Sequence, residues 1–395
     1  MYLQLTRVRE AGRMFPAAPL IASLVAAGAV QAQPPRIQSG PIEAPAVREA
    51  IDKSRVLLET WLADNHIAGA AVAVAVDGRI VWSEGKGWAD LELGVPATPR
   101  TRFRIGSVSK MLAAVALMRL VEQGRLDLDA PIQRYVPDFP VKPWPITARH
   151  LAGHLSGIRH YRESDFTADT PVGRNEHFLT DRDALRIFET DPLEFEPGTR
   201  SLYSTYGYSV LAAAIAGAAG VSYQQVVHDL IVRPLGLRGI SADHPYHLVP
   251  DRSKPYVYRA NERVTINAGF TDNSYKWAGG GYVATADDLV LLASALTGPG
   301  LLSVRSLEVM FTPQVLASGE LATSGAAPVG IGWRIDRDEQ GRRRFHHGGS
   351  LTGGGAMLLT LPDEHVTVAV VTNQLPRPPE ALASQVAAWF AGSSR

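Results

Sequence analysis

Strand-forming patterns occur near both ends of this sequence, and helix-forming patterns fill most of the region between them. An apolar run at 70–76, the turn pair Asp77-Gly78 and a second apolar run at 79–82 predict a β-hairpin in the N-terminal part. Four strand patterns follow towards the C-terminus, at 330–335, around Phe345, at 356–360 and at 366–372. This order predicts an α/β (α+β) fold with one antiparallel sheet built from both terminal parts and flanked by helices.

The middle of the chain supplies the second part of the predicted architecture. Six helical patterns occur from there to the C-terminal end, at 183–189, 208–219, 223–231, 287–296, 303–311 and 379–390. We expect sheet segments at about 42–124 and 276–395 and a mainly helical insert at about 125–275, all within one domain at 42–395. A functional site would lie between the sheet and the insert, which is a common place for pockets.

The first 32 residues have the three parts of an export signal. Three arginines give a positive start, an apolar stretch follows at 14–30, and Val30-Gln31-Ala32 offers small residues for cleavage. A membrane anchor is the alternative, but the stretch is short and contains prolines. We therefore predict a signal peptide at 1–32, a flexible lead-in at 33–41 and an exported, periplasmic or secreted protein without a stable membrane anchor.

Charge and cysteine content exclude several classes of function. Lys plus Arg and Asp plus Glu both total 39, so the formal net charge is zero and the basic excess typical of nucleic-acid binding is missing. Cysteine is absent, which rules out a thiol nucleophile, disulfides and cysteine-based zinc sites. Because there is no basic excess, we expect no nucleic-acid partner.

A Ser-x-x-Lys pattern occurs twice, and its surroundings separate the two copies. Ser83 stands at the end of a predicted strand, and the glycines around Lys86 leave no helix to bring that lysine over the serine. Ser107 opens the strongest helical pattern of the chain, at 107–123, so Lys110 shares its helix face and can reach its hydroxyl. A helix start also suits an oxyanion. The alternative is that Ser107 only caps the helix.

Two further elements carry candidate chemistry. Tyr203, in the stretch 202–208, can shuttle a proton if nearby cations lower its pKa from about 10; the alternative is an aromatic residue that caps the following helix. His347, in the glycine-rich stretch 346–350, can orient a carboxylate or protonate a leaving group; the alternative is a β-turn with surface histidines. No acidic residue or further histidine stands nearby at ligand spacing, so we predict no metal.

In their order and setting, these elements resemble the serine β-lactamases and penicillin-binding proteins, in particular the class C-like branch with its esterases, D-aminopeptidases and alkaline D-peptidases. Within that branch, four longer stretches are similar to the mitochondrial serine β-lactamase-like proteins of animals. These stretches are 103–110, 154–161, 202–208 and 273–281. The resemblance covers residues from about 45 to 373 and implies the fold of that family.

The resemblance also implies a role for each residue of the site. Ser107 would be acylated after Lys110 takes its proton, and Tyr203 would pass a proton to the leaving group. The backbone N–H groups of Ser107 and Ser350 would form the oxyanion hole. His347 would stand where many relatives have lysine. No cofactor is implied, and hydrolysis follows acylation.

Two departures from the family pattern bear on the substrate. Thr205 replaces an asparagine that contacts the substrate amide in relatives, and His347-Gly348-Gly349 replaces Lys-Thr-Gly. An unperturbed imidazole loses its charge as the pH rises above about 6.5, so a substrate carboxylate would be held less firmly there. We therefore expect poor hydrolysis of β-lactams.

These inferences predict that residues 42–395 form the catalytic domain of an exported serine hydrolase. Its substrates would be small molecules or peptides with amide or ester bonds, and we favour a peptidase. A true β-lactamase or an esterase is the first alternative. A binding or self-assembling scaffold with weak catalysis is the second, because a fold does not fix a function. The sequence leaves the oligomeric state open.

Overall fold

The computed structural model describes residues 45–298, 300–374 and 378–393. The predicted signal peptide at 1–32 and lead-in at 33–41 therefore lie outside the described residues. Within the described ranges, no single helix has the length and hydropathy of a membrane span, although the bent pair Thr205–Ala219 and Tyr223–Leu235 meets both criteria together.

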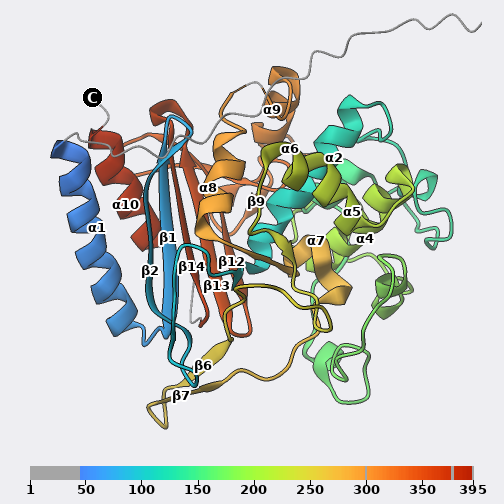
Figure 1. The fold of residues 1–395 in the computed structure, drawn as a ribbon. Helices are drawn as coiled ribbons and strands as arrows, with labels where there is room; N and C mark the ends of the chain where they lie inside the picture. Colours follow the sequence, from blue (N-terminus) through green and yellow to red (C-terminus); the bar gives the residue numbers. More distant parts are fainter. Residues whose placement is uncertain (1–44, 299, 375–377, 394–395) are drawn as a thin grey trace, which may run out of the picture. The chain divides into compact units, whose positions relative to one another are not determined.

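Seven strands form one antiparallel sheet whose members come from the two terminal parts of the sequence (Figure 1). In spatial order they are β11 (Arg334–Arg337), β12 (Arg343–Leu351), β13 (Gly354–Leu361), β14 (Val366–Thr372), β1 (Gly69–Val76), β2 (Arg79–Asp90) and β3 (Val95–Pro96). β14 pairs with β1 along its whole length, with Ala70 opposite Thr372. The predicted fold class is therefore confirmed, and β1 and β2 form the predicted hairpin around Asp77-Gly78.

The α-helices fall into two groups. Three helices pack against the sheet, and these are α1 (Pro45–Asp64), α8 (Ala286–Ser294) and α10 (Glu380–Ser393). The others gather around the central helix α2, and they are α2 (Ser109–Glu122), α3 (Ala148–Ala152), α4 (Thr205–Ala219), α5 (Tyr223–Val227), α6 (Arg233–Leu235), α7 (Trp277–Gly280) and α9 (Val304–Phe311). Shorter strands lie beside them: β4 (Phe103–Arg104), β5 (Ser241–Ala242), β6 (Tyr256–Arg259), β7 (Val264–Asn267), β8 (Tyr282–Ala284), β9 (Thr323–Ser324) and β10 (Ala327–Pro328).

Alternating large and small side chains in β1 explain why helices cover both faces of the sheet. Val72 and Val74 belong to the apolar cluster that includes α1 and α10, two helices that lie side by side in Figure 1. Ala71 and Ala73 point to the opposite face, because successive strand residues alternate, and there α8 packs on β1 and β14. Their small side chains let α8 approach the sheet closely.

α2 lies at the centre of the helical part and is buried on almost every side. A helix that is apolar all round is typical of such a position. The sequence predicts that this helix begins at Ser107, but the structure places Gly106–Val108 in a 3₁₀ turn and begins α2 at Ser109. The hydroxyl of Ser107 makes no capping hydrogen bond, so it is free for another role.

The strand predicted at 330–335 begins only at Arg334. Gly332 has a φ of +79°, which is not an extended conformation, so the strand can begin only after this residue. The shorter strand brings Arg334 opposite His346 of β12.

Candidate active site

Ser107 lies on the short turn between β4 and α2, pressed against β12. Gly106 has a φ of +50°, and a Cβ on this residue would lie 2.7 Å from the backbone nitrogen of Ser350. A Cβ on Gly349 would overlap the carbonyl oxygen of Ile105. Glycine at both positions lets the turn and the strand meet without side chains between them.

Lys110 reaches Ser107, the predicted nucleophile, from one helical turn further along the chain. Its Nζ lies 3.2 Å from Oγ of Ser107, 3.3 Å from Oγ1 of Thr205 and 2.6 Å from the carbonyl oxygen of Gly279. Three oxygen contacts hold the amine in one place. The predicted pairing of Ser107 with Lys110 is thus present in the structure.

The surroundings of Lys110 favour the neutral amine. Its side chain is fully buried, and this burial lowers its pKa well below the ordinary lysine value. The positive charges of Lys276 and Arg334 lower the pKa of Lys110 further. A neutral amine 3.2 Å from a hydroxyl can accept its proton.

Tyr203 lies on the other side of the serine hydroxyl. Its phenol donates a hydrogen bond of 2.7 Å to Oγ of Ser107, and Nζ of Lys110 lies 4.8 Å from its ring centre. Burial raises the pKa of Tyr203, and the opposing effects of Ser107 and Arg334 do not overcome it. Arg334 does lower this pKa, but burial outweighs it, so the expectation of a pKa below about 10 is wrong: the phenol keeps its proton and is a donor at neutral pH.

The second Ser-x-x-Lys copy is not a site. The hydroxyl of Ser83 donates to a carboxylate oxygen of Asp287 at 2.5 Å, on the strand β2. Nζ of Lys86 lies 2.7 Å from a carboxylate oxygen of Glu59. Serine and lysine thus have separate acidic partners.

β12 presents a free edge to the nucleophile. β11 pairs with β12 only as far as His346, so in the described part of the chain the edge from there to Ser350 has no strand neighbour on that side. Ser350 and Ser107 both line the same cavity. Their backbone N–H groups are the predicted oxyanion hole, and the close approach at Gly349 brings the two segments together.

This cavity has a volume of about 670 Å³ and opens beside the nucleophile. Its wall includes several of the predicted site residues and two cations, namely Ser107, Tyr203, Thr205, Ser350, Lys276 and Arg334. The predicted oxyanion and substrate-binding residues are therefore close to the predicted nucleophile. Among the described residues, no group of three or more His, Asp or Glu side chains is arranged to hold a metal ion.

His347 occupies a different position from the one expected. It is not among the described residues that line this cavity; its ring is buried and centred 6.3 Å from the Tyr203 ring. Its Nδ1–H donates to the carbonyl oxygen of Gly348 at 2.7 Å. Burial lowers its pKa well below the usual histidine value, and Arg334 and Lys110 lower the pKa further. The prediction of an imidazolium that holds substrate carboxylates at mildly acidic pH is therefore wrong.

Arg334 and Lys276 provide the positive charge instead. No carboxylate among the described residues pairs with either side chain, although both line the cavity. The third cation of the wall, Arg344, is neutralised because it contacts Asp336 at 2.6 Å and Glu380 at 3.3 Å. Two uncompensated cations thus remain beside the nucleophile.

Sequence reasoning missed both of these cations. Lys276 stands within the stretch 273–281 that carries the family resemblance, so its position could have marked it. Arg334 follows the glycine-rich run at 330–333 and has no local signal beyond that. It faces the cavity because β11 places it opposite His346.

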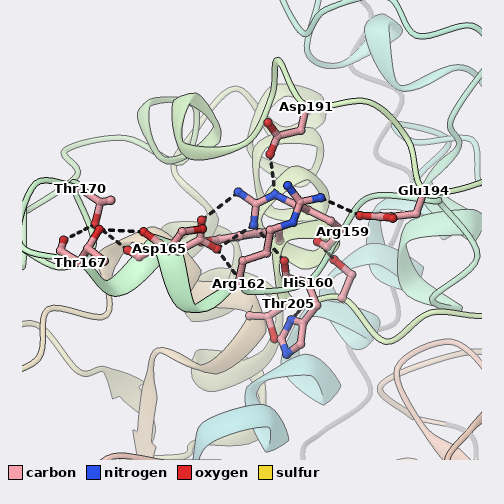
Figure 2. Close-up of polar contacts among 12 residues, drawn as sticks. Arg159, His160, Arg162, Asp165, Thr167, Thr170, Asp191, Glu194 and Thr205 are labelled. Carbon is pink, nitrogen blue, oxygen red and sulfur yellow. Dashed lines mark hydrogen bonds and ion pairs between the residues drawn. The ribbon is translucent and has the colours of Figure 1, made fainter.

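The segment 154–161 forms a further wall, and a buried ion-pair network anchors it (Figure 2). The guanidinium of Arg159 contacts both carboxylate oxygens of Asp165, at 2.7 and 2.9 Å, and one oxygen of Asp191 at 2.5 Å. The next residue, His160, lines the cavity and contacts the backbone of Thr205. The network therefore fixes residues that face the site.

The family model described as Beta-lactamase matches residues 48–392, which is most of the chain and includes every site residue named above. The chain belongs to the beta-lactamase family. Relatives of this chain include an esterase, a D-aminopeptidase and a penicillin-binding protein. The chain is therefore a serine hydrolase, as the sequence predicts.

Individual relatives indicate how wide this family is. The chain is 32% identical to the human mitochondrial serine beta-lactamase-like protein LACTB, over 83% of this chain and 74% of the relative. It is 30% identical to the esterase EstB of Burkholderia gladioli, over 74% of this chain and 82% of that protein.

Solved structures with the same fold are equally varied in function. EstCE1, a hydrolase with promiscuous acyltransferase activity, superposes with a TM-score of 0.74 at 26% identity, over 88% of this chain and all of that chain. The octameric penicillin-binding protein homologue from Pyrococcus abyssi superposes with a TM-score of 0.74 at 25% identity, over 87% and 77% of the two chains.

Proposed function

We propose that this chain is an exported hydrolase that cleaves amide or ester bonds of small molecules or peptides through an acyl-enzyme on Ser107, with peptides as the favoured substrates. One observation carries the proposal: Oγ of Ser107 lies within hydrogen-bond distance of both a buried amine and a protonated phenol. An amine that accepts a proton and a phenol that supplies one are the two partners that acyl transfer requires.

The proton and electron balance of the acylation step follows from these contacts. Nζ of Lys110 takes the hydroxyl proton as Oγ of Ser107 bonds to the substrate carbonyl carbon. The N–H groups of Ser107 and Ser350 receive the negative charge on the carbonyl oxygen. When the bond to the leaving group breaks, Tyr203 protonates that group and regains a proton from the Lys110 ammonium. Water then hydrolyses the acyl ester and frees the serine.

The charge of the cavity bears on the substrate. Arg334 and Lys276 attract a negatively charged group, and a peptide carboxylate next to the scissile bond is one such group. A D-aminopeptidase of Gluconobacter oxydans is 27% identical to this chain, which supports the peptidase emphasis. The similarity to the esterase EstB favours ester hydrolysis as a second candidate function.

Export rests on residues 1–32, which lie outside the described residues. A signal peptide there would give a mature protein that starts near Gln33. Mass spectrometry of the N-terminus of the protein from cell fractions tests this. An intact Met1 on protein recovered only from the cytoplasm would reject the export proposal.

Labelling with a fluorescent fluorophosphonate tests the catalytic proposal. Wild-type protein should be labelled and Ser107→Ala should not, while both melt at similar temperatures. A panel of D- and L-peptides, p-nitrophenyl esters and nitrocefin then ranks the substrate classes. Equal labelling of wild type and Ser107→Ala would reject the mechanism, and fast nitrocefin turnover would replace the peptidase by a β-lactamase.

A further inference from the structure

Two imidazoles that the mechanism above does not use contact the backbone just after Tyr203. Nδ1 of His154 accepts the backbone N–H of Ser204, and Nδ1 of His160 accepts the backbone N–H of Thr205, each at 3.2 Å. His160 and Thr205 are drawn in Figure 2. A ring nitrogen accepts a hydrogen bond only when it carries no proton, so both rings are neutral with the proton on Nε2.

The same two rings pack against the phenol that contacts the nucleophile. The ring centres of His154 and Tyr203 lie 4.4 Å apart, and those of His160 and Tyr203 lie 5.5 Å apart in an edge-to-face arrangement. In addition, the carbonyl oxygen of His154 accepts the N–H of Leu202 at 2.9 Å. His154 therefore holds the backbone on both sides of Tyr203, while its ring contacts the phenol itself.

His154 adopts an uncommon backbone conformation. Its φ is +62°, in the left-handed region, where histidine, asparagine and aspartate occur more often than other residues apart from glycine. Its side chain is almost fully buried against Tyr203 and Tyr208. A buried, left-handed histidine beside a reactive group is the kind of local strain that a fold retains where geometry matters.

Burial keeps both rings neutral, and charged neighbours add to its effect. Burial lowers the pKa of His154 well below its ordinary value, and Lys110 of α2, Arg334 of β11 and His160 lower the pKa further. Within the described residues, no carboxylate opposes this lowering of the His154 pKa.

His160 has a mixed set of charged neighbours. Burial lowers its pKa to about 4, helped by Lys110 and Lys276. Asp165 acts in the opposite direction and Arg159 acts with the other cations. Both rings can thus accept hydrogen bonds throughout the neutral range.

We propose that His154 and His160 are positioning residues that hold Tyr203 against Ser107 and Thr205 against Lys110 by accepting the consecutive backbone N–H groups of Ser204 and Thr205. This proposal rests on the proposed role of Tyr203 as the proton donor. Loss of either acceptor leaves a buried N–H group without a partner and lets the phenol move away from the nucleophile. A displacement of about 1 Å in such a group can lower a rate by about a hundredfold.

Paired substitutions at His160 separate the hydrogen bond from mere bulk. In His160→Asn, the side-chain oxygen can occupy the position of Nδ1 and accept the Thr205 N–H, whereas His160→Leu has similar bulk but no acceptor. We expect the Asn variant to stay within about threefold of the wild-type kcat and the Leu variant to lose about tenfold to a hundredfold, with little change in KM. His228→Leu is the control, since its side chain is 57% exposed.

Two esters with different leaving groups distinguish positioning of Tyr203 from general damage. Hydrolysis of phenyl butyrate needs a proton on its leaving group more than hydrolysis of p-nitrophenyl butyrate does. The loss in His160→Leu should therefore be larger for phenyl butyrate, whereas a merely structural defect would lower both rates by the same factor. The rate of fluorophosphonate labelling gives the same comparison without a substrate: it should fall in the Leu variant and persist in the Asn variant.

His154→Asn extends the test to the second ring, because asparagine tolerates a positive φ and retains an acceptor. It should also keep most of the wild-type labelling rate. If the Leu variant does not fold, the activities of the Asn variants and the ring tautomers of the wild type test the proposal instead. Long-range ¹H–¹⁵N spectra of the wild type should show Nδ1 unprotonated in both rings at about pH 7.

Three results would overturn the proposal: a folded His160→Leu with wild-type rates, Asn variants as impaired as the Leu variant, or a proton on Nδ1 of either ring. The proposed function has a separate test. If Ser107→Ala is labelled like the wild type, the acyl-enzyme mechanism fails. If the wild type is labelled and Ser107→Ala is not, but the Leu and Asn variants of the histidines react at equal rates, the positioning role fails and the acyl-enzyme mechanism stands.

Discussion

The phenol of Tyr203 lies 2.7 Å from Oγ of Ser107, and Nζ of Lys110 lies 3.2 Å from the same oxygen. Burial acts in opposite senses on these two neighbours: it raises the pKa of Tyr203 and lowers the pKa of Lys110. One buried pocket therefore favours the protonated phenol and the neutral amine. That difference supports the proposed roles of Tyr203 as proton donor and Lys110 as base.

Replacing the nucleophile should remove activity without unfolding the protein. Ser107→Ala removes only a hydroxyl that caps no helix, so stability should change by less than about 1 kcal/mol while turnover falls by orders of magnitude. Ser83→Ala is the matched control, because Ser83 bonds to Asp287 away from the site. Labelling and steady-state rates check both variants. An inactive Ser83→Ala would show that the wrong serine has been chosen.

Lys110→Arg should be inactive, because a guanidinium stays protonated and cannot take the serine proton. Falling pH protonates Lys110, so activity should decline on the acid side. Since the pKa of Lys110 lies well below its ordinary value, that decline should occur far below the usual titration range of lysine. The pH profile of kcat/KM measures it, with Lys86→Arg as a silent control. An active Lys110→Arg would remove Lys110 from the role of base.

Arg334 should set the affinity for substrates that carry a carboxylate. Arg334→Gln should raise KM for such a substrate by about tenfold, equivalent to about 1.4 kcal/mol, and leave a matched neutral ester unchanged. Arg334→Lys keeps the charge and should lose less. Because a guanidinium holds its charge, carboxylate affinity should be flat between about pH 6 and 8. A decline over that range which His347→Gln abolishes would return this role to His347.

The ion-pair network in Figure 2 predicts a difference between buried and exposed pairs. Asp165→Ala leaves the buried guanidinium of Arg159 short of a partner and should cost about 3 kcal/mol of unfolding free energy. Glu194→Gln breaks the pair with Arg162, whose side chain is 50% exposed, and should cost less than about 1 kcal/mol. Urea unfolding of the two variants measures both values. Equal losses would contradict the role assigned to burial.

Acid should weaken the same network. Burial raises the pKa of Asp165, but hydrogen bonds, chiefly from Arg159, outweigh it, so the folded-state pKa is lower than the ordinary value. The stabilisation is therefore complete above about pH 4, the ordinary range of an aspartate, and is lost as the pH falls through the lower folded-state value. Asp165→Ala should lose less stability than the wild type over that acid range.

Gly349→Ala should disable the enzyme through the backbone. The added methyl group would overlap the carbonyl oxygen of Ile105 and push β12 away from Ser107. Turnover should fall by at least about tenfold, with Gly269→Ala, where a Cβ meets nothing within 4 Å, as the control. Wild-type turnover in Gly349→Ala would contradict the close contact of strand and turn.

Local patterns were enough to predict the fold class and the contact between Ser107 and Lys110. The alternation of valine and alanine in β1 and the buried pattern of α2 are properties of neighbouring residues, and the helical spacing brings Lys110 to Ser107. The charge of the cavity depends instead on residues that are distant in sequence. Arg344 is neutralised by Asp336 and Glu380 from two other elements, whereas Arg334 is not, and no spacing rule distinguishes the two arginines.

Dependence on residues that are distant in sequence also explains why the expected pKa values of Tyr203 and His347 were wrong. Their pKa values follow burial, which depends on the packing of α2, α4 and β12 together. The sequence identifies the titratable groups but not how far each one is buried away from water in the folded protein. Desolvation was therefore the property that only the structure could supply.

The pairing of β1 with β14 also determines when the protein can fold. Val366–Thr372 lies between β13 and β1 in the sheet, so during synthesis the hairpin of β1 and β2 waits for a strand that comes much later in the sequence. Closing so long a loop is slow, and until it closes the apolar edge of β1 needs protection from other chains. The two walls that carry Ser107 and Ser350 therefore come together only after Val366–Thr372 has been made, and a product truncated before Val366 should be inactive and a substrate for chaperones.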